Sequence, residues 1–170
     1  MIKRTLLFLG LSIFFTANLI AQEPTAWRGG NDGIYSETGL LKQWPADGPE
    51  IIWTFEELGE GHSSPVFANN QIYISTMIGD EGYIFVLGED GKLKWKVNYG
   101  KEFTESYPGA RSSVVVAGDL MYIYSGFGEV VCMDANAGTE KWRKKAFEDF
   151  DGDNIKWGVT ETVLVDGDKI

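Results

Sequence analysis

From about residue 62 onward, short apolar runs alternate with brief polar turns. The runs are rich in β-branched and aromatic residues, as at Ile72-Tyr-Ile and Met121-Tyr-Ile, and they are divided by turn signals such as Asn69-Asn70 and Gly118-Asp119. This pattern is typical of strands joined by hairpins, because Asn, Asp and Gly tolerate the backbone angles of tight turns. No apolar spacing of about 3.6 residues runs through the same stretch, so the pattern predicts an all-β fold.

The pattern repeats with a fixed period. Ser64, Ser113 and Thr162 occupy equivalent positions and follow one another at intervals of 49 residues. Each unit carries the signals for four antiparallel strands, and a period of about 40–50 residues with four strands per unit is typical of β-propeller blades. The expected units are blade one at 62–97, blade two at 111–145 and the start of blade three at 160–170.

Each full unit ends in a similar stretch of 11 residues, Phe85–Trp95 in the first and Cys132–Trp142 in the second. Both stretches have glycine at the seventh position and tryptophan at the end. Asp and Asn side chains bend a chain by bonding the nearby backbone, and glycine supplies a positive φ angle. We therefore expect a tight turn, followed by a strand that places a large indole on one face of the sheet.

These stretches resemble the tryptophan-docking motif of pyrroloquinoline-quinone-like (PQQ-like) propeller repeats, roughly Ala-x-Asp-x-x-Thr-Gly-Lys-x-x-Trp. In the second copy Cys132 stands at the Ala position, and Asp134 matches the Asp. The first copy has Phe85 and Leu87 at these two places. The resemblance implies an all-β propeller of about seven or eight blades, of which about two, with flanking strands, lie in this chain. It also implies five structural docking residues: Trp53, Trp95, Asp134, Gly138 and Trp142.

Residues 1–21 resemble a secretory signal peptide, with Lys3 and Arg4 before an apolar core at Leu6–Phe15 and Ala21 at the expected cleavage point. The alternative is an uncleaved anchor, although the apolar core is much shorter than the ~20 residues that span a bilayer. We expect export to the periplasm or the medium, with no stable membrane insertion after cleavage. Loss of the two basic residues changes the formal net charge from −10 to −12, which argues against nucleic acid as a partner.

The segment 22–49 is expected to be irregular. Part of it, Trp27–Gly33 followed by Glu37–Leu41, also resembles the start of secreted PQQ-like propellers. Residues 51–55 are expected to form a strand that closes the ring by joining the last blade, because full closure removes exposed sheet edges. Since two blades cannot close a ring, we interpret the sequence as the N-terminal part of a longer protein.

Few residues in the chain point to catalysis. The acidic run Asp149–Asn154 could bind Ca²⁺, but it fits neither the EF-hand pattern nor that of the calcium-binding repeats, so a solvated turn is favoured. For His62, the one histidine, a packing or turn role is favoured over a role as base or ligand. For Arg111, a structural salt bridge is favoured over a site for an anion or a quinone carboxylate.

Two further residue types have structural interpretations. Serines recur at 63–64 and at 112–113, and this recurrence favours backbone capping over a nucleophile. Cys132 is expected to be a buried, inert thiol, and a chain with a single cysteine forms no internal disulfide. No catalytic or metal-binding residue is therefore assigned.

Two functions remain open. One is a non-catalytic exported propeller that serves as a binding or assembly scaffold and holds a protein partner or a small ligand at its face. The other, implied by the family resemblance alone, is a dehydrogenase of alcohols or sugars that uses pyrroloquinoline quinone and Ca²⁺. Such enzymes carry a pair of adjacent cysteines near the quinone, and this sequence has no such pair. The sequence favours the scaffold, because nothing in it requires catalysis.

Overall fold

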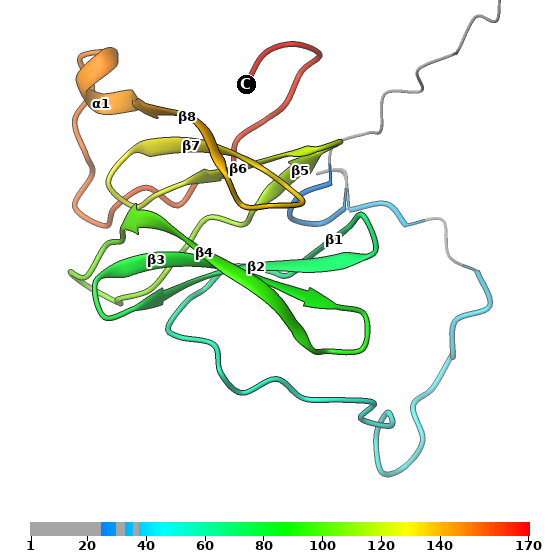
Figure 1. Ribbon diagram of the computed structural model, residues 1–170. Helices are drawn as coiled ribbons and strands as arrows, with labels where there is room; N and C mark the ends of the chain where they lie inside the picture. Colours follow the sequence, from blue (N-terminus) through cyan, green and yellow to red (C-terminus); the bar gives the residue numbers. More distant parts are fainter. Residues whose placement is uncertain (1–24, 30–32, 36–37) are drawn as a thin grey trace, which may run out of the picture.

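The computed structural model describes residues 25–29, 33–35 and 38–170. Within them, eight strands form two four-stranded antiparallel sheets, which lie one above the other in Figure 1. The first sheet has the order β1 (Val66–Ala68), β2 (Gln71–Ile78), β3 (Glu81–Gly88) and β4 (Leu93–Lys101). The second has the order β5 (Val115–Ala117), β6 (Leu120–Tyr124), β7 (Glu129–Asp134) and β8 (Glu140–Lys145). The expected all-β fold of four-stranded antiparallel sheets is confirmed. The leader expected at 1–21 lies outside the described residues.

Tight hairpins connect the strands, so that strands adjacent in the sequence are also adjacent in each sheet. Asn69 and Asn70 join β1 to β2 with φ angles of 51° and 55°. Two successive positive φ angles match the right-handed twist of the strands that such a turn connects. The Asn-Asn turn signal in the sequence therefore has a direct structural cause.

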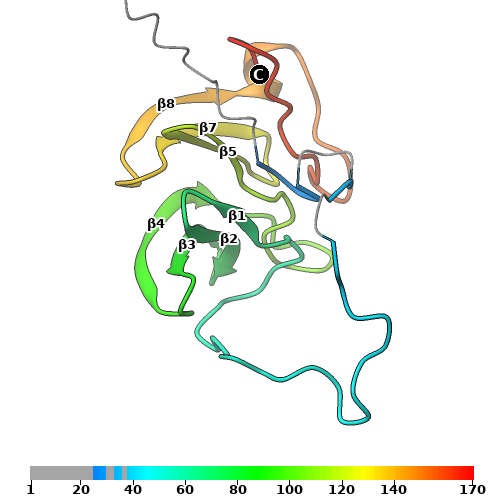
Figure 2. The same ribbon diagram turned by 90° about the vertical axis from the view of Figure 1, so that its right-hand side faces the viewer.

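The main hydrophobic core lies between the two sheets, which pack face to face with β4 and β8 on the same side (Figure 2). Both sheets contribute side chains that are fully or almost fully buried, and Trp95 and Val97 pack against the edge of this core. Burial of apolar area of this kind is the largest favourable contribution to folding. The buried members of the core are Val66, Ala68, Tyr73, Ile84, Val86, Tyr99, Val114, Val116, Met121, Ile123, Val131, Met133 and Ala135.

Hydrogen bonds between repeat-equivalent residues hold successive units in register. The backbone N–H of Ser64 donates to Oγ of Ser113 at 3.0 Å, and the Asn69 amide donates to the carbonyl of Gly118 at 3.0 Å. In each pair the two residues are separated by 49 positions. The interval found in the sequence is therefore also the interval of the bonds between units.

Segments outside the strands cover the outer faces of the two sheets. Residues 51–55 form no strand among the described residues, but Phe55 packs edge-on against Phe85 of β3 at 6.1 Å between ring centroids. On the second sheet, Val163 and Val165 pack against a small apolar cluster that includes Cys132. The expected closing strand at 51–55 remains a prediction, because its partner strand would belong to another blade.

Little helix is present. The one described helix, α1 (Ala146–Asp149), is four residues long and follows β8 directly. Across the described part of the chain, no helix combines the length and the apolar character needed to cross a membrane.

Candidate functional site

Two tryptophans rest on glycine turns of the unit that follows them. The Trp53 ring lies against Gly91, where a Cβ atom would be 2.4 Å from the indole, and Trp53 Nε1 donates to the carbonyl of Glu89 at 3.0 Å. The Trp95 ring lies against Gly138 in the same way, at 2.9 Å from a Cβ placed there. These two contacts connect the segment before the first sheet to that sheet, and the first sheet to the second.

The turn that contains Gly138 is shaped by Asp134. Oδ1 of Asp134 accepts hydrogen bonds from the backbone N–H of Asn136 at 3.0 Å and of Ala137 at 3.1 Å. Oδ2 lies 3.1 Å from Nζ of Lys141, and this bond is the main cause that lowers the pKa of the Asp134 carboxyl. The turn thus holds its glycine at a φ of 69°, a value that residues with a side chain rarely adopt.

A docking role predicts that the Trp142 side chain is largely buried, and this prediction is wrong. Its side chain is 37% exposed, and its ring contacts Tyr122 with 6.0 Å between centroids. Trp53 and Trp95 each contact a glycine of the turn before the fourth strand of the following unit. Among the described residues, no glycine has Trp142 among the nearest contacts of a Cβ placed on it.

The strand register also corrects the alignment of the two stretches. Trp95 pairs with Val86 in the first sheet, and Trp142 pairs with Cys132 in the second. The structural counterpart of Cys132 is therefore Val86 and not Phe85. The turn before Gly91 is one residue shorter than the turn before Gly138, because it is closed by Gly88 and Lys92 instead of Asp134 and Thr139.

An open hollow lies just before β1 and β5, the first strands of the two sheets, which are called the inner strands below. Equivalent positions of three units meet there. It has a volume of about 650 Å³ and is lined by His62, Tyr107, Arg111, Trp157 and Thr160. His62, Arg111 and Thr160 follow one another at intervals of 49 residues. They also line an adjoining polar compartment of about 410 Å³, which Ser64, Ser113, Glu161 and Thr162 complete.

Arg111 does not form the salt bridge that the sequence favours. Its guanidinium instead donates to the backbone carbonyls of Ser106 and Tyr107, the second at 2.8 Å, and lies over the Phe103 ring at 4.9 Å. No carboxylate lies within ion-pair distance of Arg111 in the described part of the chain. The connector of 102–110 is thus folded around the guanidinium, whose charge also acts on the Glu102 carboxyl and opposes the rise of its pKa.

The recurrent serines bond the backbone, which is the role that their recurrence favours. Ser63 Oγ donates to the carbonyl of Ser75 at 2.7 Å, and Ser112 Oγ donates to the carbonyl of Glu161 at 2.6 Å. The backbone N–H of His62 donates to the carbonyl of Ala110 at 2.7 Å, while its ring lines the hollow. These contacts fix the inner strands and do not assemble a nucleophile with a base.

Neither the acidic run Asp149–Asn154 nor Cys132 belongs to a metal-binding cluster among the described residues. Among the described residues, no group of three or more His, Cys, Asp or Glu side chains is placed to hold a metal ion. In the acidic run, the Asn154 amide donates to the carbonyl of Gly126 at 2.9 Å. Cys132 is buried, and this burial raises the pKa of its thiol.

Sequence reasoning missed Glu102, a carboxyl that is 1% exposed at the end of β4. It accepts hydrogen bonds from the Tyr99 hydroxyl at 2.8 Å, and from the backbone N–H groups of Phe103 at 3.0 Å and Gly126 at 3.1 Å. Burial raises the pKa of Glu102, although these bonds oppose the shift. Because Gly126 lies beyond β6, the carboxyl links the two units. No local sequence signal marks it, since its partners come together only in the fold.

The comparisons with known proteins agree with this geometry. The family model described as outer membrane protein assembly factor BamB matches residues 100–170. The structure resembles that of a europium-containing methanol dehydrogenase with a TM-score of 0.53 and 16% identity, over 70% of this chain and 21% of that one. This chain carries PQQ-like β-propeller repeats. At 16% identity, the resemblance to the dehydrogenase shows the fold alone.

One curated relative adds sequence similarity to the shared fold. The outer membrane protein assembly factor BamB of Salmonella typhimurium is 30% identical over 105 residues. The match covers 57% of this chain and 26% of that protein. The matched part thus spans about a quarter of the length of its relative.

Proposed function

We propose that the protein is an exported, non-catalytic scaffold that assists the assembly of outer-membrane proteins from the periplasmic side. The observation that carries the proposal is the 30% identity to an outer membrane protein assembly factor, which extends over 57% of the chain. The similarity to the methanol dehydrogenase, at 16% identity, is one of fold and brings no activity with it.

The chemistry of the described residues supports a binding role. The recurrent serines of the inner strands donate to backbone carbonyls, and the guanidinium of Arg111 holds a connector. What remains accessible is a surface with a hollow and several exposed aromatic side chains, including Tyr107 at 76% and Trp157 at 49%. Exposed apolar groups around a hollow are typical of a site that binds a partner.

In this proposal, the docking residues hold neighbouring blades of the scaffold together. We propose that Trp53, Trp95 and Trp142 each rest on the glycine turn of the next blade, and that residues 51–55 join the last blade to close the ring. Trp142 and residues 51–55 would then contact blades that lie outside this sequence. In this arrangement the repeats form a rigid body, and the connectors between blades form the surface that a partner contacts.

Deletion and complementation in the encoding organism test the assembly role. We expect the deletion strain to contain less folded outer-membrane β-barrel, as measured by heat-modifiable migration on gels, and the full-length gene to restore it. In parallel, purified full-length protein is incubated with pyrroloquinoline quinone and Ca²⁺ and then assayed for dye-linked alcohol oxidation. Normal barrel levels in the deletion strain, together with quinone-dependent oxidation, would reject the scaffold in favour of the dehydrogenase.

A further inference from the structure

The connector that follows β4, residues 102–110, is held at its start by a buried carboxyl. The Glu102 side chain is 1% exposed and accepts a hydrogen bond from the Tyr99 hydroxyl of β4 at 2.8 Å. It also accepts hydrogen bonds from the backbone N–H of Phe103 at 3.0 Å and of Gly126 at 3.1 Å. Gly126 lies in the hairpin between β6 and β7. One carboxyl therefore fastens the connector to both sheets.

Glycines let the neighbouring loops approach this carboxyl closely. A Cβ on Gly126 would lie 2.9 Å from Oε2 of Glu102 and 2.6 Å from Cβ of Phe103. A Cβ on Gly158 would lie 2.8 Å from the Phe103 ring. The Gly126 carbonyl accepts a hydrogen bond from the backbone N–H of Val159 at 3.1 Å. These loops enclose the start of the connector and keep water away from the carboxyl.

The elements packed around the carboxyl place no cation in contact with it. At the turn between β2 and β3, Asp80 pairs with Lys101 at 2.7 Å. The hairpin between β6 and β7 contains no charged residue, and Lys156 of the next connector lies over the Trp157 ring at 4.8 Å. Within the part of the chain that the structure describes, no lysine or arginine forms an ion pair with Glu102.

Hydrogen bonds and one distant charge favour the ionised form of Glu102, and burial opposes them. The Tyr99 hydroxyl and two backbone N–H groups donate to the carboxyl, and the positive charge of Arg111 acts on it from beyond ion-pair distance. Burial is the larger effect, because a carboxylate that loses its water without gaining a cation is less favoured than the neutral acid. The pKa of Glu102 is therefore raised in the folded protein.

The middle of the same connector has a strained backbone. Ser106 and Tyr107 have φ angles of 43° and 60°, and residues with a side chain rarely adopt positive φ. The Arg111 guanidinium holds this turn by donating to both carbonyls. The docked connector is thus kept in place by a carboxyl at its start and a guanidinium after its end, and its release would relieve the backbone strain.

We propose that the connector 102–110 is a latch that ionisation of Glu102 releases. While the carboxyl is neutral, it stays buried and the connector stays docked. When the connector opens, the carboxyl reaches water and gives its proton to the solvent. Opening therefore becomes more favourable as the pH rises from the ordinary value of 4.5 to the raised pKa. It also displaces Tyr107, which lines the hollow, so the latch makes the shape of this surface depend on pH.

Hydrogen exchange of the full-length protein, followed by mass spectrometry, measures this opening. The fragment that covers 102–110 reports it, because the Phe103 amide is bonded to the carboxyl. Division of its exchange rate by that of an unprotected peptide at the same pH gives the open fraction. We expect the open fraction to rise with pH, by up to about tenfold per pH unit, between 4.5 and the raised pKa and then to level off.

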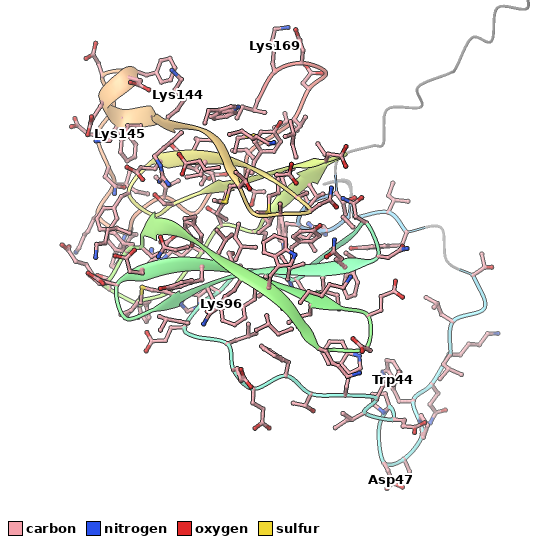
Figure 3. All side chains as sticks on the ribbon, viewed as in Figure 1. Trp44, Asp47, Lys96, Lys144, Lys145 and Lys169 are labelled. Carbon is pink, nitrogen blue, oxygen red and sulfur yellow. The ribbon has the colours of Figure 1, made fainter. Side chains whose placement is uncertain are left out.

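Matched variants assign the pH dependence to one carboxyl. Glu102→Gln keeps an acceptor for the two backbone N–H groups and carries no titrating proton, so its open fraction should not change with pH across that window. Two controls remove exposed carboxylates instead. Glu105→Gln lies on the connector itself, and Asp47→Asn lies on the loop that projects away from both sheets (Figure 3). Both controls should keep the pH dependence of the wild type.

Tyr99→Phe keeps the test decisive if Glu102→Gln misfolds. The substitution removes a hydrogen bond that favours the ionised carboxyl, so the rise of the open fraction should continue to a higher pH than in the wild type. Equal upper limits in the two proteins would count against the latch.

Three further results would overturn the inference. A constant open fraction in the wild type would make Glu102 a structural residue only. A fraction that falls as the pH rises would mean that the ionised carboxyl holds the connector. An unchanged pH dependence in Glu102→Gln would assign the titration to another group. The exchange experiment needs purified protein only and concerns the connector itself, so its failure is separate from failure of the assembly role, which appears in the deletion strain.

Discussion

Gly138→Ala tests whether the contact between a tryptophan and the next unit's glycine holds the sheets together. Gly138 has a φ of 69°, and a Cβ there would lie 2.9 Å from Cζ3 of Trp95 and 3.2 Å from Cβ of Val97. Gly118 is the matched control, because its φ is 59° and a Cβ there would meet nothing within 4 Å. Both substitutions carry the same backbone cost, and only Gly138→Ala disturbs the indole.

The magnitudes follow from these two contributions. A side chain in the left-handed region costs about 1–2 kcal/mol, which is the whole effect expected for Gly118→Ala. Insertion of a methyl group into a packed contact costs a further ~1–3 kcal/mol. Gly138→Ala should therefore lower the free energy of unfolding by about 2–5 kcal/mol, and the difference between the variants measures the contact with the ring.

Urea denaturation of full-length protein, followed by circular dichroism, gives both free energies of unfolding. The double variant Gly138→Ala with Trp95→Ala completes a cycle, in which the extra cost of the methyl group should largely disappear because the ring is gone. The reasoning is refuted if the two glycine variants differ by less than about 0.5 kcal/mol, the usual limit within which independent effects add.

Three further predictions address other parts of the chain. Burial raises the pKa of Glu102 in the folded protein, so the wild type loses stability as the pH rises from the ordinary value of 4.5 to the raised pKa. Glu102→Gln carries no titrating group at this position and should gain stability relative to the wild type across that window in pH-dependent urea melts, and a constant difference between the two proteins would contradict this. In full-length protein, Trp142→Ala should cost about as much as Trp95→Ala, up to ~3–5 kcal/mol; a loss under about 1 kcal/mol on thermal melting would contradict its docking to a further blade. Residues 22–170 expressed alone should associate, since residues 51–55 are unpaired and Ile52 is 87% exposed; a single monomeric species on size-exclusion chromatography would contradict this.

The repeat could be predicted from the sequence because both the turns within a unit and the contacts between units require particular residues at fixed positions. The turns at Asn69-Asn70 and Gly138 need particular backbone angles, and only a few residue types tolerate them. The same 49-residue interval then recurs in the bonds from Ser64 to Ser113 and from Asn69 to Gly118. The turns and the bonds between units therefore follow one period of 49 residues, and this period was enough to predict the fold class from the sequence.

Other features depend on contacts between residues that are far apart in the sequence. Equal lengths of the two stretches align Phe85 with Cys132, but the turns within the stretches differ in length, and only the strand register shows this difference. The exposure of Trp142 depends on the unit that packs against it, and the sequence of its own strand does not indicate it. The positions of the Glu102 carboxyl and the Arg111 guanidinium depend on hydrogen-bond partners at Gly126 and Tyr107. These partners come together only when the connector between the sheets folds, so no spacing in the sequence indicates them.

Reconstitution tests the central claim, that this protein is an assembly scaffold, most directly. Outer-membrane assembly machinery from the same organism is placed in liposomes, and the rate at which an unfolded β-barrel substrate becomes protease-resistant is measured with and without the full-length protein. The account predicts that the substrate becomes protease-resistant faster when the full-length protein is present than when it is left out. An unchanged rate across a range of protein concentrations would contradict it.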